Sequence, residues 1–128
     1  MPIPGAITNA RSADVSGDWI AVGFPEATIY GLSNAGRVAI LHRADDGLWS
    51  VHQWLLPPTG LASMNGHFGK FVAIDGDTLV VGAPLFVGAE PAMIGAAGVF
   101  VRGADGLYSL THIIEPKNPL EYLGASVA

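Results

Sequence analysis

Residues 68–84 read Phe68-Gly69-Lys70-Phe71-Val72-Ala73-Ile74-Asp75-Gly76-Asp77-Thr78-Leu79-Val80-Val81-Gly82-Ala83-Pro84. Two apolar runs flank an Asp-Gly step, a pattern typical of a β-hairpin, because glycine adopts the positive φ of a tight turn without a Cβ clash. The first run predicts a strand over 70–74, and the second predicts an inner strand over 78–83, apolar on both faces.

The sequence after this hairpin predicts two more strands. Pro84 is expected to stop the pairing, and a loop is expected from Pro84 to Ile94. A third strand follows over 96–102, and Asp105-Gly106 predicts a turn into a fourth strand over 107–114. The unit is therefore a four-stranded antiparallel sheet.

The same pattern occurs a second time, 59 residues earlier, because Gly17-Asp18 aligns with Gly76-Asp77 and Arg43 with Arg102 without a gap. It predicts strands over 11–15, 19–24, 38–42 and 48–55. In the last of these, simple alternation places Leu55 on the face of Trp49 and Val51. A repeat of this length indicates a unit that must stack on its neighbours to bury its faces.

These residues resemble the FG-GAP repeat, the blade motif of integrin α-subunit propellers and of many bacterial surface proteins. Phe68-Gly69 and Gly82-Ala83-Pro84 carry the resemblance, followed by Gly95 to Val101. The first repeat is degenerate, with Asn9-Ala10 in place of Phe-Gly. The expected organisation is an N-terminal extension (1–9), blade 1 (10–67), blade 2 (68–122) and the first strand of a third repeat (123–128).

The resemblance implies an all-β fold of β-propeller blades, usually extracellular or on the cell surface, that binds proteins or glycans and is not an enzyme. Many family members hold calcium in an Asp-x-Asp-x-Asp-Gly loop. This sequence lacks that loop, so no metal or other cofactor is expected. The leading function is a non-catalytic module for protein binding or self-assembly. The alternatives are a glycan-binding lectin and a fragment of a larger propeller protein or enzyme.

The composition agrees with many short buried strands, since 50% of the 128 residues are hydrophobic and 13% are charged. A net charge of −5 argues against binding to nucleic acid or to an anionic membrane. There is no cysteine, so thiolate chemistry is excluded. The apolar run over 79–101 contains Pro84 and Pro91, which break a helix, so no membrane insertion is expected. The first residues, Met1 to Gly5, lack the pattern of a signal peptide.

Two blades expose apolar sheet faces that need a cover. We expect either self-association, for example as a trimer with six blades, or a longer propeller of which this chain is a piece. Strand exchange between copies would use the last five residues, namely Gly124, Ala125, Ser126, Val127 and Ala128.

Loops between the second and third strands are expected to form the partner surface, because such loops gather at one end of a propeller. The candidate residues are apolar or aromatic, namely Ile29, Tyr30, Leu85, Phe86, Val87, Met93 and Ile94. These side chains either contact a partner or fill the gap to an adjacent blade.

Other side chains have two interpretations each. Trp49, Trp54 and Tyr108 could stack on sugar rings, although packing over a hairpin is favoured. Asp18, Asp75 and Asp77 could hold a metal, although turn hydrogen bonds explain them with fewer assumptions. The histidines show no ligand spacing and are expected to be ordinary strand and loop residues; they are His42, His52, His67 and His112.

Overall fold

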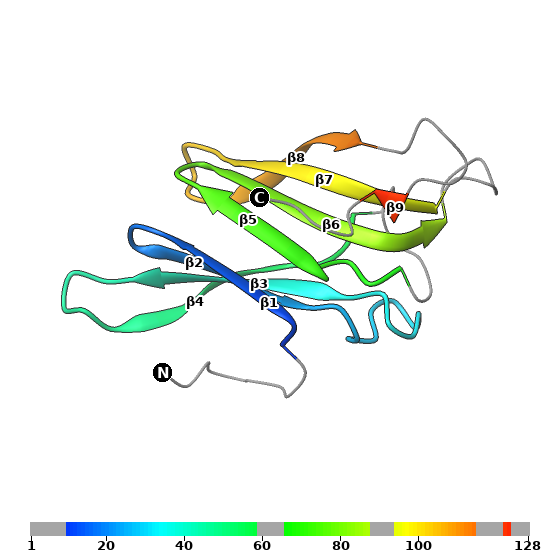
Figure 1. Cartoon of the computed structure of the whole chain (residues 1–128). Helices are drawn as coiled ribbons and strands as arrows, with labels where there is room; N and C mark the ends of the chain where they lie inside the picture. Colours follow the sequence, from blue (N-terminus) through cyan, green and yellow to red (C-terminus); the bar gives the residue numbers. More distant parts are fainter. Residues whose placement is uncertain (1–9, 59–65, 88–93, 115–121, 124–128) are drawn as a thin grey trace.

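A computed structural model gives the structure of the protein and describes residues 10–58, 66–87, 94–114 and 122–123. Every regular element in these residues is a strand, and the strands form two sheets that pack on each other (Figure 1). The first sheet has the strands β1 (Ser12–Ser16), β2 (Trp19–Phe24), β3 (Arg37–Arg43) and β4 (Trp49–Leu55). The second sheet has β5 (Phe71–Asp75), β6 (Thr78–Val87), β7 (Ile94–Arg102), β8 (Tyr108–Ile114) and β9 (Tyr122–Leu123).

The first four strands of each sheet form a meander in which each strand pairs antiparallel with the next, in the order β1-β2-β3-β4 and β5-β6-β7-β8, whereas β9 pairs in parallel with β7. The predicted hairpins are confirmed. Gly17 and Gly76 occupy the same turn position and have φ values of 57° and 58°. In the later turn of each sheet, Asp46 and Asp105 accept a backbone hydrogen bond from the residue two positions ahead, at 3.0 Å. The repeat in the sequence is therefore a repeat in the structure.

The predicted loop from Pro84 to Ile94 is wrong at both ends. Strand β6 continues through Leu85 and Phe86 to Val87, and β7 begins at Ile94. The pairing register shifts between Ala83 and Val87. A proline lacks an N–H group and is tolerated where a ladder is irregular, so Pro84 interrupts the register but does not end the strand.

The predicted face of Leu55 is also wrong, because both sheets contain a β-bulge. Ile40 pairs with Gln53 whereas Leu41 pairs with Val51, which leaves His52 as the extra residue. An extra residue reverses the alternation beyond it. Leu55 therefore packs between the sheets, while Trp49, Val51 and Trp54 lie on the outward face of the first sheet. The second sheet has its bulge at the equivalent position, between Val99 and Phe100.

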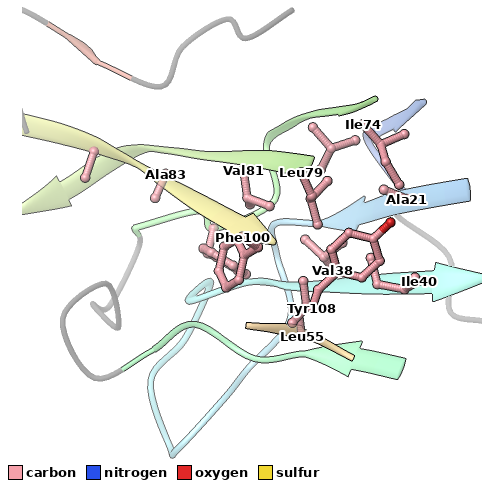
Figure 2. Packing of buried hydrophobic residues seen from close by; sticks show 13 residues of the cluster. Ala21, Val38, Ile40, Leu55, Ile74, Leu79, Val81, Ala83, Phe100 and Tyr108 are labelled. Atoms are coloured by element: carbon pink, nitrogen blue, oxygen red, sulfur yellow. The ribbon is translucent and has the colours of Figure 1, made fainter. Parts of the chain in front are cut away.

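The main hydrophobic core lies between the two sheets. The first sheet contributes four buried residues to it, and the second contributes nine, including Phe68, Leu79, Val81 and Phe100. Figure 2 shows side chains of both sheets converging on the space between them, with Phe100 and Tyr108 facing Val38 and Leu55. Burial of this cluster joins two sheets that could not cover these faces alone.

At one end of the interface the two backbones touch. A Cβ atom added at Gly23 would lie 1.8 Å from the carbonyl oxygen of Gly69, so no larger residue fits there. Gly36 adopts a φ of 92° and forms a parallel bridge with Phe68. The Phe-Gly pair thus marks the place where the chain leaves the first sheet and enters the second.

The strand β9 repeats this crossing at the far side of the second sheet. Leu123 pairs in parallel with Gly95, which is the residue equivalent to Gly36. Leu123 therefore has the same register relative to the second sheet as Phe68 has relative to the first. Residues 124–128, the rest of the predicted opening of a third repeat, lie outside the described residues.

Candidate functional site: the open face of the second sheet

The interface between the sheets shows what an occupied sheet face requires. Strand β1 directs three polar side chains at the backbone of the second sheet, because alternate residues of a strand share a face. Ser12 Oγ donates to the carbonyl oxygen of Gly69 at 3.0 Å. Asp14 Oδ2 accepts from the N–H of Ile74, and Ser16 Oγ accepts from the N–H of Gly76, both at 2.9 Å.

At the other edge of the interface, Gln53 forms two hydrogen bonds with the backbone of Tyr108. Its Nε2 donates to the carbonyl oxygen of Tyr108, and its Oε1 accepts from the N–H of the same residue, both at 2.9 Å. The neighbouring His52 lies 2.7 Å from the carbonyl oxygen of Gly106 through Nε2. These contacts fix the register of β8 against the first sheet.

A ring cluster closes the same end of the interface. Trp19 packs against His42 and His52, with ring centroids 4.2 and 5.0 Å away, and against Tyr108 at 5.9 Å. The guanidinium of Arg102 lies 4.3 Å from the Trp19 ring, within the range of a cation–π contact. His52, which was expected to be an ordinary strand residue, therefore contacts the second sheet, and His42 packs against Trp19 within the first sheet.

Burial of Tyr108 raises the pKa of its phenol above the ordinary value of 10.0. The positive charge of Arg102 opposes this shift, and the negative charge of Asp77 adds to it. The hydroxyl donates a hydrogen bond to the carbonyl oxygen of Gly76 at 3.1 Å, which favours the neutral form.

The aspartates after the Gly-Asp turns form ion pairs, and the same pair occurs in both sheets. Asp18 binds Arg43 with a shortest distance of 2.6 Å, and Asp77 binds Arg102. Within the described residues, no three His, Cys, Asp or Glu side chains come together as a candidate metal site. Asp18 and Asp77 thus link the start of the second strand to the end of the third, a role that the sequence analysis missed.

The open face is the outward side of the second sheet. By repeat position it corresponds to the side of the first sheet that the second sheet covers. It carries Phe71, Ala73, Val80, Ala97, Val99, Val101 and Ile114. Leu55 of the first sheet is 6% exposed, whereas Ile114, its equivalent, is 40% exposed. Val101 is also exposed, at 36%, whereas Phe71, Ala73, Val80 and Val99 are partly buried and Ala97 is buried. The clearest contrast between equivalent apolar positions is therefore that of Leu55 and Ile114.

A hollow of about 410 Å³ lies at the β5–β6 end of the open face. It is lined by Asp14, Ala73, Ile74, Asp75, Thr78 and Val80. Ala73 stands at the position of Asp14, which binds the N–H of Ile74, and Val80 stands at the position of Ala21, which belongs to the core between the sheets. The hollow is thus at the place where a neighbouring sheet inserts its first strand.

The outward side of the first sheet has a different character. The guanidinium of Arg37 lies 3.9 Å from the Trp54 ring, and that of Arg43 lies 5.5 Å from the Trp49 ring. Under the indoles, Val22, Phe24, Ala39 and Leu41 are buried. The suggested sugar platform is not assembled as one surface, because Tyr108 is buried between the sheets.

The predicted partner residues are spread over several places. Ile29 bridges to Leu32, and the exposed Tyr30 has a φ of 56° and donates through its hydroxyl to the carbonyl oxygen of Pro57 at 3.3 Å. Leu85, Phe86 and Val87 belong to β6, and Ile94 begins β7. Met93 lies outside the described residues, as do Gly124, Ala125, Ser126, Val127 and Ala128.

Comparison with known families agrees with this repeat structure. The family model of the FG-GAP repeat matches residues 49–100. The chain contains an FG-GAP repeat. The matched segment runs from β4 of the first sheet to β7 of the second, so the FG-GAP repeat includes the crossing at Phe68-Gly69. No curated protein matches the chain. Among the described residues, no helix has the length and apolar character needed to cross a membrane.

Proposed function

We propose that this protein is a non-catalytic propeller-type module that binds other proteins through the open face of the second sheet. The observation that carries the proposal is the unequal burial of equivalent residues, represented by Leu55 at 6% exposed and Ile114 at 40%. Binding of a partner that buries the open face is stabilised by the hydrophobic effect, in the same way as the contact between the two sheets.

The partner is a protein surface because the first sheet shows how such a face is covered. Its cover is a second sheet, with one layer of interdigitated apolar side chains and hydrogen bonds to backbone groups at the edges. An ordinary protein interface buries roughly 800 Å² per partner, which is the scale of one sheet face. Propeller blades pack on each other in this way.

The same reasoning favours binding over catalysis. The open face presents aliphatic side chains and a hollow with two carboxylates, a surface suited to contact. In keeping with the FG-GAP resemblance, we place the module outside the cell or on the cell surface, with its partner there.

Ile114→Asp tests the proposal, since this substitution adds a charge at the most exposed apolar residue of the open face, at the end of β8. Partners recovered with the wild-type chain are identified, purified and measured for direct binding. We expect the dissociation constant to rise about tenfold or more for Ile114→Asp, because an unpaired buried charge is costly. Leu48→Asp is the matched control, since Leu48 is exposed in the β3–β4 turn. Equal binding by all three chains contradicts the proposal.

A further inference from the structure

The repeat equivalence also identifies the occupant of the open face, a step that rests on the proposed function. We infer that the open face binds the outward side of the first sheet in a second copy of this chain, head to tail. In this arrangement Leu123 of one copy stands at the position that Phe68 has between the two sheets of one chain. The first repeat of the other copy has Asn9 at this position.

The first argument comes from the register of β9. Phe68 bridges to Gly36 as the chain enters the second sheet, and its buried ring packs 6.0 Å from that of Phe100. Leu123 pairs with Gly95, the equivalent of Gly36. Strand β9 therefore brings Leu123 to the edge of the second sheet that corresponds to the crossing at Phe68.

The second argument comes from the sequence of the first repeat. Asn9-Ala10 stands where the second repeat has Phe68-Gly69, so the first repeat lacks an apolar residue at this position. Leu123, in β9, is an apolar residue at the corresponding position after the second sheet. The apolar residue that one sheet lacks is thus present at the edge of the face onto which that sheet would dock.

The third argument is the match between the hollow and an exposed valine. Val15 is 59% exposed, although its equivalent in the second sheet, Ile74, is 5% exposed because it packs against the first sheet. Applied to two copies, the same packing inserts Val15 between Ala73 and Val80. Trp49, the equivalent of Tyr108, then lies over the neighbouring part of the open face.

Hydrogen bonding at the hollow agrees with the same pairing. Asp75, which lines the hollow, has the position of Ser16, which accepts a hydrogen bond from the N–H of Gly76. In the second copy the equivalent donor is the N–H of Gly17, so the carboxylate of Asp75 meets a backbone donor across the contact.

The contact joins two different surfaces, so it is heterologous, and a closed ring forms where the rotation between copies permits it.

The test of this contact uses Val15→Asp, which blocks the face of the first sheet, and Ile114→Asp, which blocks the face of the second. Both residues are exposed within one chain, so each variant is expected to fold. Circular dichroism confirms folding, and sedimentation equilibrium measures the mass.

We expect the wild type to associate in a concentration-dependent manner and each variant alone to associate about tenfold or more weakly. An equimolar mixture of the two variants should form a one-to-one dimer, because each retains the face that the other has lost. Leu48→Asp should associate like the wild type. Leu48 is 69% exposed, and its equivalent Leu107 remains 43% exposed although its sheet is docked.

Three results overturn the inference. They are a wild type that stays monomeric at all concentrations, association that only Ile114→Asp weakens, and a mixture that does not form the dimer. A monomeric wild type that binds another protein, with binding lost in Ile114→Asp, retains the proposed function and rejects the second copy as the partner.

Discussion

Arg102 of the second sheet stacks on Trp19 of the first, with 4.3 Å between the guanidinium carbon and the ring centroid. Arg43, its equivalent, pairs with its own aspartate in the same way but contacts only Trp49 of its own sheet among the described rings. The same ion pair is thus used twice, and the ring stack between sheets is formed where a neighbouring sheet is present.

The first prediction concerns this stack. Trp19→Thr introduces the residue that the second repeat has at the equivalent position, Thr78. We expect a loss of about 2 kcal/mol in the free energy of unfolding, because a half-buried ring and its cation–π contact are removed. Urea denaturation measures the change. Arg43→Lys, which retains the charge outside the interface, should cost less than about 1 kcal/mol; equal losses would contradict the stack between sheets as the cause.

The second prediction concerns the contact between backbones. Gly23→Ala places a Cβ 1.8 Å from the carbonyl oxygen of Gly69, so one sheet must move away from the other. We expect a loss of about 3 kcal/mol in the free energy of unfolding. Gly103→Ala is the control, because its added Cβ meets first a carboxylate oxygen of Asp105 at 3.2 Å, an approach that a shift of a few tenths of an ångström in this side chain relieves. Thermal denaturation of both variants distinguishes the two cases, and a harmless Gly23→Ala would reject the contact.

The third prediction concerns the polar residues of β1. Asp14→Ala leaves the N–H of Ile74 without its carboxylate partner, and we expect a cost of about 2 kcal/mol. Ser16→Ala removes a more exposed hydrogen bond to Gly76, and we expect a cost below about 1 kcal/mol. Hydrogen exchange at the amide of Ile74 provides the direct measurement. Unchanged protection in Asp14→Ala would show that this bond does not join the sheets.

The fourth prediction concerns alkaline pH. The pKa of Tyr108 is raised in the folded protein, so its neutral form contributes stability that is fully present below the pKa of the unfolded chain. This contribution is lost as the pH rises through the folded pKa, above 10.0. We expect the melting temperature of the wild type to fall more steeply above pH 10 than that of Tyr108→Phe. Parallel profiles for the two proteins would reject this role for the phenol.

The sequence predicts the strands and turns of this fold well, because both repeats carry Gly-Asp and Asp-Gly turns between apolar runs. It does not predict the bulges, since the extra residue at His52 has no distinctive side chain and simple alternation places Leu55 on the wrong face. The prediction from Pro84 fails for a related reason. A proline does not fit a regular ladder of hydrogen bonds, so it predicted the end of the strand, but Pro84 lies where the register of β6 shifts and the strand continues.

The candidate site is only partly predictable. The sequence predicts a partner surface from apolar loop residues. The open face is instead made of strand residues, and their exposure depends on which sheet has a neighbour. One signal was present in the sequence. Ser12, Asp14 and Ser16 alternate along a strand expected to be apolar, and the second repeat has Phe71 and Ala73 at the first two of these positions. Such polar alternation indicates hydrogen bonds to the backbone of a neighbouring sheet. Its absence in the second repeat indicates that a surface covering this face makes apolar contacts there.

The two sheets meet backbone to backbone at Gly23 and Gly69, and they are held apart by rings at Trp19 and Tyr108. Their inclination therefore depends on the size of one supporting side chain at the wider end. Because Thr78 replaces Trp19 in the second repeat, a sheet that docks on the open face is expected to have a different tilt. Varying this single position gives protein engineers a way to alter the curvature of a stack of such units while every strand keeps its hydrogen bonds.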